Sequence, residues 1–486
     1  MKRELELMEF DTAHRPRPHV NALVRPHHLF TPKQRLEAAV KAGWNVFQFP
    51  SEMLQGGDLL SDSGTTTPTV EQFSRMILAL GDTAYGTNWG YPQLVDAFRQ
   101  TFGDTVMDCE MYFFHQGRSA EHALYLHLGG RGLVVPSNSF FDTTRANAEA
   151  RGILALDLPD TSNPDFGGNI DLKKLEQVLE EHEGSIPFVL MTVTNNTGGG
   201  QPVSMRNLRD VYRLATGKYN ISILLDMCRF AENAWFIKHR EKEFMPGGLR
   251  EHDSINTIVK RMFSYCDGFT ISLKKDGLAN MGGALVLRQN ARFLDVQPQM
   301  LENIRDHQFL TESHPTQGGI SARDQLVIAE GLKRVVCEDY LAGRIGLVHD
   351  FGNYLAGLGV PVVEPFGGHA VYIDMDRFFA DTEMRREDFG GISLTALLLL
   401  KGVRLCELGA FAFGRFNSDS GAHILPERNY VRAAVPRNKY ERDDLYYVAD
   451  CIKELYDRRH ELPKAVPVYG QEKALRHFKA RFELKY

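Results

Sequence analysis

Residues 265–283, YCDGFTISLKKDGLANMGG, decide which fold we expect. Residues 268–271 are an apolar run typical of a β-strand, and Ser272, Lys274, Lys275 and a turn rich in Gly and Asn follow it. Such a strand delivers polar side chains to the carboxyl edge of a sheet, where open α/β sheets bind ligands. A lysine there is partly desolvated and needs an anionic partner or a covalent bond. The pair is therefore either a Schiff-base site for an aldehyde cofactor or a solvated surface pair.

Helical and β-type segments alternate from residue 70 to 330, which predicts a sheet of mainly parallel strands covered by helices. The expected strands are residues 132–136, 153–156, 187–194, 221–225, 268–271 and 284–287. The expected helices are residues 32–42 with Thr31 as N-cap, 121–128, 172–183 and 205–216, and one long helix from Leu326 towards Leu347.

The 486 residues are enough for more than one domain. We expect an N-terminal arm (1–30), a segment that belongs to a smaller domain (31–69), a large ligand-binding domain (70–330) and a C-terminal α+β part of the small domain (331–486). The aperiodic mixture of Pro, His and Arg in the first 30 residues favours an extended arm that lies on another surface.

Composition excludes several classes of protein. A hydrophobic content of 43% with 24% charged residues is typical of a soluble globular protein, and a net charge of −6 argues against nucleic acid as a partner. The six cysteines have no metal-ligand spacing, which favours reduced thiols in a cytoplasm. No apolar run approaches the roughly 20 residues of a membrane span. No GxGxxG motif opens a βαβ unit, so a dinucleotide-dependent dehydrogenase is not expected.

Two further motifs indicate a phosphate-bearing, cationic ligand. In HQGRSAE (115–121) a glycine precedes a helix, and helix N-terminal amides beside an arginine bind anions, so Gln116, Gly117 and Arg118 are candidate phosphate contacts. Asp226 ends the apolar run ISILLD, and a carboxylate at a buried strand end needs a cationic partner. A protonated pyridine nitrogen would supply that charge. A plain helix start and a structural ion pair remain the alternatives.

These features resemble, along nearly the whole chain, the tryptophanase and tyrosine phenol-lyase family of β-eliminating lyases. The similar stretches are DLLSDSGT, GDTAY, HQGRSAE, FFDTTR, GNIDL, GGQPVSM, DMCRFAENAWFIK, SLKKD, EPFGGHAVYID and LRHFKARF. The resemblance implies a pyridoxal-phosphate (PLP) enzyme of fold type I, with a mostly parallel seven-stranded sheet, a smaller α+β domain and a homotetrameric assembly with active sites at a dimer interface.

The resemblance also assigns residues. It implies Lys275 as the Schiff-base lysine, Lys274 as its neighbour and Ser272 as a further phosphate contact. Asp226 would bind the pyridine nitrogen, and Arg432 the substrate carboxylate. The other implied contacts are Phe141 stacked on the ring, Arg229 and Asn196 near the phenolic oxygen, Phe47 and Ser63 beside the substrate, and Gly64 and Asn280 at a monovalent cation.

The residues at the leaving-group end favour an indole-type substrate. Similar phenol-lyases carry a threonine and an arginine where this chain has Asp142 and Leu408, and an unpaired phenolic hydroxyl costs about 1–3 kcal/mol. Asp142 and His477 are similar to the tryptophanase pattern. Thr83 replaces an acidic cation ligand, so a potassium requirement is in doubt.

The expected reaction is β-elimination from a tryptophan-like amino acid. Lys275 removes the Cα proton, and Tyr85 or Asp142 protonates the leaving carbon. Residues 86–89 (GTNW) and 65–69 (TTTPT) depart from the family, so β-substitution, transamination, or elimination from tyrosine or a specialised amino acid remain alternatives on the same scaffold. A non-catalytic homologue is the rival of a different class.

Overall fold

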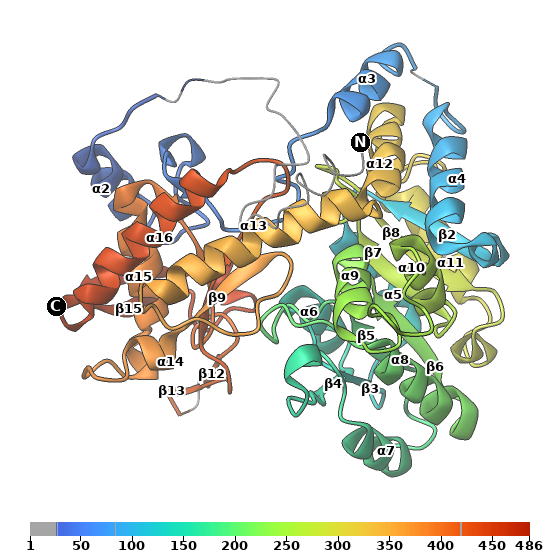
Figure 1. The fold of residues 1–486 in the computed structure, drawn as a ribbon. Helices are drawn as coiled ribbons and strands as arrows, with labels where there is room; N and C mark the ends of the chain where they lie inside the picture. Colours follow the sequence, from blue (N-terminus) through green and yellow to red (C-terminus); the bar gives the residue numbers. More distant parts are fainter. Residues whose placement is uncertain (1–25, 27, 83, 418–419) are drawn as a thin grey trace.

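The computed structural model describes residues 26, 28–82, 84–417 and 420–486 (Figure 1). The predicted N-terminal arm, residues 1–30, lies outside the described residues except for residues 26 and 28–30. In Figure 1 the chain forms two bodies. One is built around a central sheet, and the other contains the C-terminal elements.

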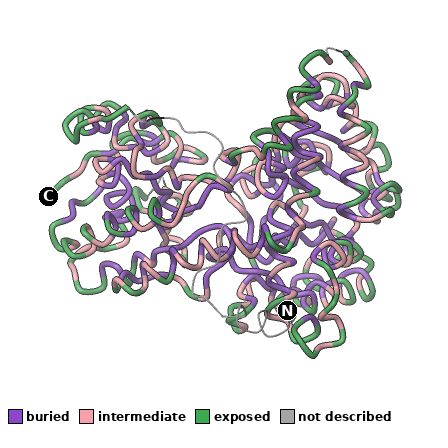
Figure 2. The backbone as a smooth tube through the Cα atoms, turned by 45° about the horizontal axis from the view of Figure 1, so that its top comes forward, coloured by how far each residue is buried: buried purple, intermediate pink, exposed green. Residues whose placement is uncertain are grey.

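Among the described residues the central sheet has seven strands, the number that the family resemblance implies, and their order is β2-β8-β7-β6-β5-β3-β4. Only β8 runs antiparallel to its neighbours, β7 and β2. Their bounds are β2 Cys109–Phe114, β3 Val134–Ser137, β4 Leu154–Asp157, β5 Phe188–Thr192, β6 Ser222–Asp226, β7 Gly268–Ser272 and β8 Gly283–Arg288. The apolar runs of β5, β6 and β7 are buried at every position, which is the pattern of strands covered on both faces (Figure 2).

Helices cover both faces of this sheet. Alternate strand residues face opposite cores: Val189 and Leu225 pack in one, and Leu190 and Leu224 in the other. The first core also holds α4 Gly90–Phe102, α7 Leu172–Glu181, α8 Met205–Val211, α9 Phe230–Arg240, α10 Ile255–Phe263 and α12 Ala322–Val335. The second holds α5 Gly117–Leu128, α6 Asp142–Glu149 and α11 Met300–Thr311.

The second body has its own core around a three-stranded antiparallel sheet of order β11-β14-β9. These strands are β9 Ala370–Asp374, β11 Cys406–Leu408 and β14 Tyr430–Ala434. Helices α13 Glu338–Gly357, α15 Gly390–Leu398 and α16 Arg442–Asp457 pack there. Leu59 lies in the same core, beside β1 Gly57–Asp58, which pairs with β10 Val403–Arg404. The domain boundaries at residues 70 and 330 stay a prediction.

The remaining elements lie at the edges of these bodies. Helix α2 Pro32–Lys41 begins with the predicted Thr31 N-cap and a full capping box. Helix α3 Val70–Leu78 packs on α12. The others are α14 Met375–Phe378 and two hairpins, β12 Arg415–Asn417 with β13 Ala422–Ile424 and β15 Lys464–Tyr469 with β16 Arg481–Lys485.

One predicted element is wrong. The expected single helix from Leu326 towards Leu347 is two helices, because Cys337 is extended (φ −78°, ψ 131°) and caps α13. Hydrophobic periodicity continues through the break, so the sequence pattern does not reveal it. The break lets α12 stay on the central sheet while α13 runs across to the second body (Figure 1).

No helix among the described residues is long and apolar enough to cross a membrane.

Candidate active site

A cavity of about 160 Å³ lies at the carboxyl ends of β5, β6 and β7, with walls from both bodies. Parallel strands bring their carboxyl ends to one edge, so the polar residues that end them converge there. The predicted site residues that line it are Phe47, Ser63, Gln116, Gly117, Arg118, Phe141, Asp142, Asn196, Asp226, Arg229, Ser272, Lys274, Lys275, Leu408, Arg432 and His477.

One end of the cavity is built for an anion. Gly117 begins α5, and a Cβ atom there would lie 2.7 Å from Cβ of Ser272, so only glycine allows this approach of helix to strand. Burial, then the charges of Lys275 and Arg118, lowers the pKa of Lys274. In the described part of the chain none of these three cations forms an ion pair with a carboxylate. Arg118 and Lys274, with the N-terminal amides of α5, fit a phosphate group, and Lys275 remains available for a covalent bond.

Asp226 fits the cationic end of the same ligand. Its side chain is buried, and the hydrogen bond that it accepts comes from the backbone N–H of Cys228, at 3.1 Å. Among the described residues Asp226 has no ion-pair partner. A buried carboxylate without a cation is costly, and a protonated pyridine ring would supply the missing charge. The donor set therefore fits PLP.

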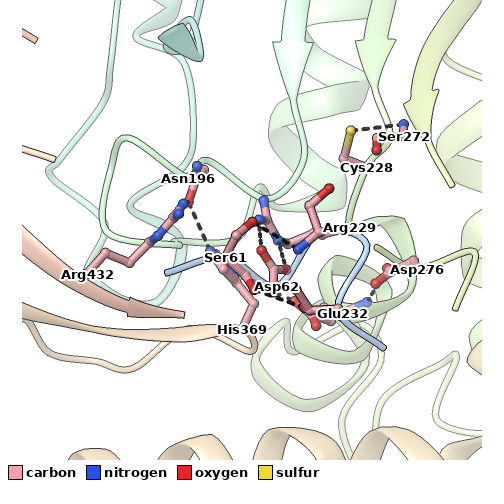
Figure 3. A network of polar contacts seen from close by, with 12 residues as sticks. Ser61, Asp62, Asn196, Cys228, Arg229, Glu232, Ser272, Asp276, His369 and Arg432 are labelled. Carbon is pink, nitrogen blue, oxygen red and sulfur yellow. Dashed lines mark hydrogen bonds and ion pairs between the residues drawn. The ribbon is translucent and has the colours of Figure 1, made fainter. Parts of the chain in front are cut away.

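Arg432, on β14, fits a substrate carboxylate. One terminal nitrogen, Nη1, donates to Oδ1 of Asn196 at 3.0 Å, and Nη2 donates to the carbonyl of Leu60 at 3.0 Å (Figure 3). Its buried Nε has no hydrogen-bond partner in the described structure. An arginine held from two sides with an unused donor is ready to bind a carboxylate.

Asn196 is oriented by three donors. Its Oδ1 also accepts from the Tyr372 hydroxyl at 2.7 Å and lies 3.0 Å from Nε2 of His369. Burial first, and then the charge of Arg229, hold the pKa of His369 well below its ordinary value, so its ring is neutral. With the proton on Nε2, that ring donates to Asn196. Because the carbonyl of Asn196 is engaged, its NH2 group is left to donate elsewhere.

Arg229 lines the cavity, but its guanidinium has a partner that sequence reasoning missed. Its Nε and Nη2 donate to the two oxygens of Asp62 at 2.9 Å and 2.7 Å, and both side chains are buried. Burial works against the charge on Asp62, yet Arg229 and Arg437 hold its pKa well below the ordinary value. Asp62 is the second aspartate of DLLSDSGT, but nothing in that local sequence pairs it with Arg229.

The leaving-group end joins two residues that are far apart in the sequence. Oδ2 of Asp142 lies 3.1 Å from Nε2 of His477, and both side chains are buried. The Phe47 ring lies 5.7 Å from the His477 ring and 4.6 Å from the Phe478 ring, centroid to centroid. Leu408 closes this end with an apolar surface.

The sequence also did not single out Glu121, which lines the cavity from α5. The hydroxyls of Thr143 and Thr144 donate to its two carboxylate oxygens at 3.1 Å and 2.7 Å. Burial, with the negative charge of Asp226 next, raises the pKa of Glu121 to about 7. Glu121 therefore joins α5 to the first turn of α6.

Three predicted residues lie outside the cavity lining. Tyr85 is 75% exposed, and its ring meets that of His314 at 6.0 Å. Asn280 donates through Nδ2 to the carbonyl of Gly64 at 3.0 Å, and the N–H of Gly64 donates to the carbonyl of Lys274 at 2.8 Å, so these two lie together next to a lining residue but do not line the cavity themselves. Thr83 lies outside the described residues. In the described ranges no group of three or more His, Cys, Asp or Glu side chains is arranged to hold a metal ion.

The fold and this site define a PLP-dependent enzyme of fold type I. The chain is similar to aspartate aminotransferase of Thermotoga maritima, with a TM-score of 0.57, 15% identity, and coverage of 88% of this chain and 98% of that chain. It is also similar to serine palmitoyltransferase of Sphingomonas wittichii, with a TM-score of 0.54, 12% identity, and coverage of 84% and 88%. At these identities the likeness shows the fold alone.

Sequence comparison gives the family. A model described as beta-eliminating lyase matches residues 58–451. The chain is 38% identical to a probable tryptophanase of Aeropyrum pernix, over 96% of both chains. It is 38% identical to tryptophanase of Hyphomonas neptunium, over 95% of this chain and 97% of that one, and 35% identical to tyrosine phenol-lyase of Pasteurella multocida, over 96% and 98%. The chain belongs to the beta-eliminating lyase family, and the predicted resemblance is confirmed.

Proposed function

We propose that the protein is a PLP-dependent β-eliminating lyase that acts on a tryptophan-like L-amino acid and releases its aromatic group with pyruvate and ammonia. The observation that carries the proposal is that Lys275, Asp226 and Arg432 line one cavity. An amine, an acid and a carboxylate-binding guanidinium in one site are what α-proton removal from an amino acid requires.

The cofactor would be held at both ends. Gln116, Gly117, Arg118, Ser272 and Lys274 would bind its phosphate, Asp226 its pyridine nitrogen, Phe141 its ring face, and Lys275 its aldehyde carbon. Bound there, PLP supplies an electron sink that acidifies the Cα–H bond of the substrate.

The chain's own residues would do the rest. Arg432 orients the substrate carboxylate, and the Lys275 amine removes the Cα proton once the substrate has displaced it. Asp142, in its protonated form, then gives its proton to the leaving carbon and becomes a carboxylate, while Nε2 of His477, 3.1 Å from Oδ2, holds the group in place. Tyr85, the other acid that the sequence offers, is 75% exposed and does not line the cavity of its own chain.

The leaving-group end supports an indole rather than a phenol. Leu408 cannot accept or donate a hydrogen bond, so a phenolic hydroxyl beside it would lose about 1–3 kcal/mol. The Phe47 ring and the apolar Leu408 surface suit the face of a wide, flat aromatic ring such as indole. Tryptophan is therefore the preferred aromatic substrate over tyrosine.

The direct test is to supply the purified protein and PLP with L-tryptophan, L-tyrosine and other β-substituted amino acids. We expect pyruvate and indole from tryptophan. Lys275→Ala should abolish turnover and the covalent label fixed by borohydride, whereas Lys274→Ala should keep that label and bind PLP more weakly. Absence of pyruvate with every aromatic amino acid would overturn the proposed reaction.

A second reaction on the same scaffold is favoured by the altered substrate side, where residues 86–89 read GTNW and residues 65–69 read TTTPT. β-Substitution or transamination would use the same lysine and the same acid. A product assay separates them, because elimination releases pyruvate with ammonia, transamination gives the substrate's own keto acid, and substitution gives a new amino acid.

We also propose a cytoplasmic homotetramer with active sites at a dimer interface. Exposed apolar side chains on and after α3 support an assembly: Val70, Phe73, Ile77, Leu78 and Leu80 are each more than half exposed. Such a cluster is unusual on a monomer and typical of an interface. Tyr85 follows this segment, so assembly is the route by which its hydroxyl would reach a cavity.

The residues near Gly64 fit a monovalent cation poorly. The Asn280 amide donates to the Gly64 carbonyl at 3.0 Å and to the Thr66 carbonyl at 3.2 Å, which engages oxygens that a cation would use. Thr83 also brings no negative charge. We propose that turnover does not need potassium. The rate of pyruvate release should be equal, within twofold, in potassium and in tetramethylammonium buffers, and a tenfold loss without potassium would contradict this.

A further inference from the structure

Arg437 follows strand β14, five residues after Arg432, and its side chain is completely buried. Its Nη1 donates to Oδ2 of Asp62 at 3.0 Å, and Nη2 donates to Oε1 of Glu232 at 2.8 Å and to Oδ1 of Asp276 at 2.8 Å. One guanidinium from the C-terminal part of the chain therefore contacts three carboxylates.

Each of these carboxylates is tied to a cavity residue. Asp276 directly follows Lys275, and its other oxygen, Oδ2, accepts the backbone N–H of Ala231 at 2.8 Å. Asp62 precedes Ser63 and holds Arg229. Glu232 lies three residues after Arg229, in the first turn of α9. Figure 3 shows the side chains of Asp62, Glu232 and Asp276 near one another.

We expect substitutions in this network to have large effects, because its side chains are buried. Burial raises the pKa of Asp276 to about 6, and the charge of Arg437 opposes that rise. Arg344, also buried, lies 3.4 Å from Glu232 and is the other cation at that carboxylate. Breaking a buried ion pair leaves an uncompensated charge, whereas breaking a surface pair costs little.

We propose that Arg437 is a positioning residue for catalysis. Its contact with Asp276 fixes the main chain next to Lys275. Because Arg437 follows the strand that carries Arg432, the same contact also fixes the position of Lys275 relative to Arg432. The two groups that must meet one substrate, an amine on the central sheet and a guanidinium on the second body, are thereby held by a single side chain. This inference rests on the proposed function.

The test uses Arg437→Lys and Asp276→Asn in the PLP-loaded enzyme. Lysine keeps the charge but cannot contact three carboxylates, and asparagine keeps the shape but not the charge. We expect each to lower kcat at least tenfold with KM changed less than threefold. We also expect PLP added to the cofactor-free protein to form its absorbing linkage with Lys275 at least fivefold more slowly. The double variant should have a kcat little lower than that of Arg437→Lys alone, because both substitutions break the same contact between Arg437 and Asp276.

Arg404→Lys is the matched control. Arg404 is also a buried arginine with a bidentate carboxylate, Asp58 at 3.0 Å and 2.6 Å, and none of its contacts adjoins Lys275. Its Nη1 also donates to the carbonyls of Val46 and Phe49, on either side of Phe47, so the two variants are compared by the rate of linkage and not by kcat. Arg404→Lys should lower the melting temperature without changing the rate of linkage.

Two outcomes would overturn the inference. The first is that Arg437→Lys behaves like Arg404→Lys, and the second is that the losses of the single variants multiply. If Arg437→Lys does not fold, Asp276→Asn decides alone, and its normal kcat and linkage rate would count against the inference. The linkage rate does not depend on which substrate is turned over, so failure of the proposed reaction is recognised separately.

Discussion

At the residue scale, the site is defined by buried polar groups whose bonding capacity the protein itself leaves unfilled. Asp226 has a backbone donor but no cation among the described residues, and Nε of Arg432 has no acceptor there. Buried groups of this kind are costly in a folded protein unless a ligand satisfies them. The two together therefore describe a ligand that is positive at one end and carries a carboxylate at the other.

Asp142 provides a test of the leaving-group step. Asp142→Asn keeps a hydrogen bond to His477 but removes the acid, so kcat with tryptophan should fall by about 10²–10⁴-fold. With β-chloroalanine the loss should be no more than a few-fold, because chloride leaves without a proton. Pyruvate release measures both rates. An equal loss with the two substrates would show that Asp142 does not act as the acid.

Single-residue predictions succeed where local sequence carries the physics. A polar residue that ends an apolar strand must lie at the sheet edge, which is why Lys275, Ser272 and Asp226 could be placed in one cavity. The pairing of Arg229 with Asp62 could not be predicted, because the residues are 167 positions apart and only the fold brings them together. The same is true of the contact of Asp142 with His477, because the resemblance assigned each residue separately and did not pair them.

At the element scale, the contact of Glu121 with Thr143 and Thr144 joins α5, which carries the phosphate-binding turn, to α6, which carries Asp142. A displacement of α6 would therefore also displace α5. The carboxylate at this joint has a raised pKa, so its charge depends on pH in the neutral range.

Glu121→Gln should remove that pH dependence. Because the folded-state pKa of Glu121, about 7, lies above the ordinary 4.5, its stabilising effect is complete below pH 4.5 and is lost as pH rises towards 7. Relative to wild type, the glutamine variant should gain up to about 3 kcal/mol between pH 5 and pH 8. Urea unfolding of the cofactor-free protein measures it. Glu181→Gln, at an exposed position, is the control. If the stability of Glu121→Gln changed with pH in the same way as that of the wild type, the raised pKa of Glu121 would be refuted.

Elements were predicted well where burial is simple. The six expected strands are all present, and five of them are short apolar runs buried at nearly every position, which gives a clear signal; the sixth, β4, is a partly exposed edge strand. The seventh, β2, was missed although Tyr112, Phe113 and Phe114 are fully buried, since Glu110 and Met111 in CEMYFF are partly exposed at the sheet edge. The break at Cys337 was missed because it follows from tertiary packing, which periodicity does not report.

At the scale of the whole molecule, the exposed apolar side chains of α3 are the feature on which the proposed assembly rests. Phe73→Glu with Ile77→Glu should lower the native mass measured by light scattering, because charge on an apolar interface is costly. Activity should fall with it if Tyr85 serves a neighbouring cavity. Leu249→Glu is the control, since Leu249 is 99% exposed but stands apart from this cluster. An unchanged mass in the double variant would exclude α3 from the interface.

Helix α13 has 20 residues, and a helix of that length spans about 30 Å. Its first turns carry Arg344, fixed near Glu232 beside the cavity, while Val348, Phe351 and Leu355 further along pack in the second core. The first part of α13 therefore lies near the active site, and the longer remainder packs in the second core. By simple geometry a tilt of about 5° at the near end displaces the far end by roughly 2.6 Å over that length. We therefore expect that a substrate-induced tilt of α13 would displace the second body by more than it displaces the cavity wall.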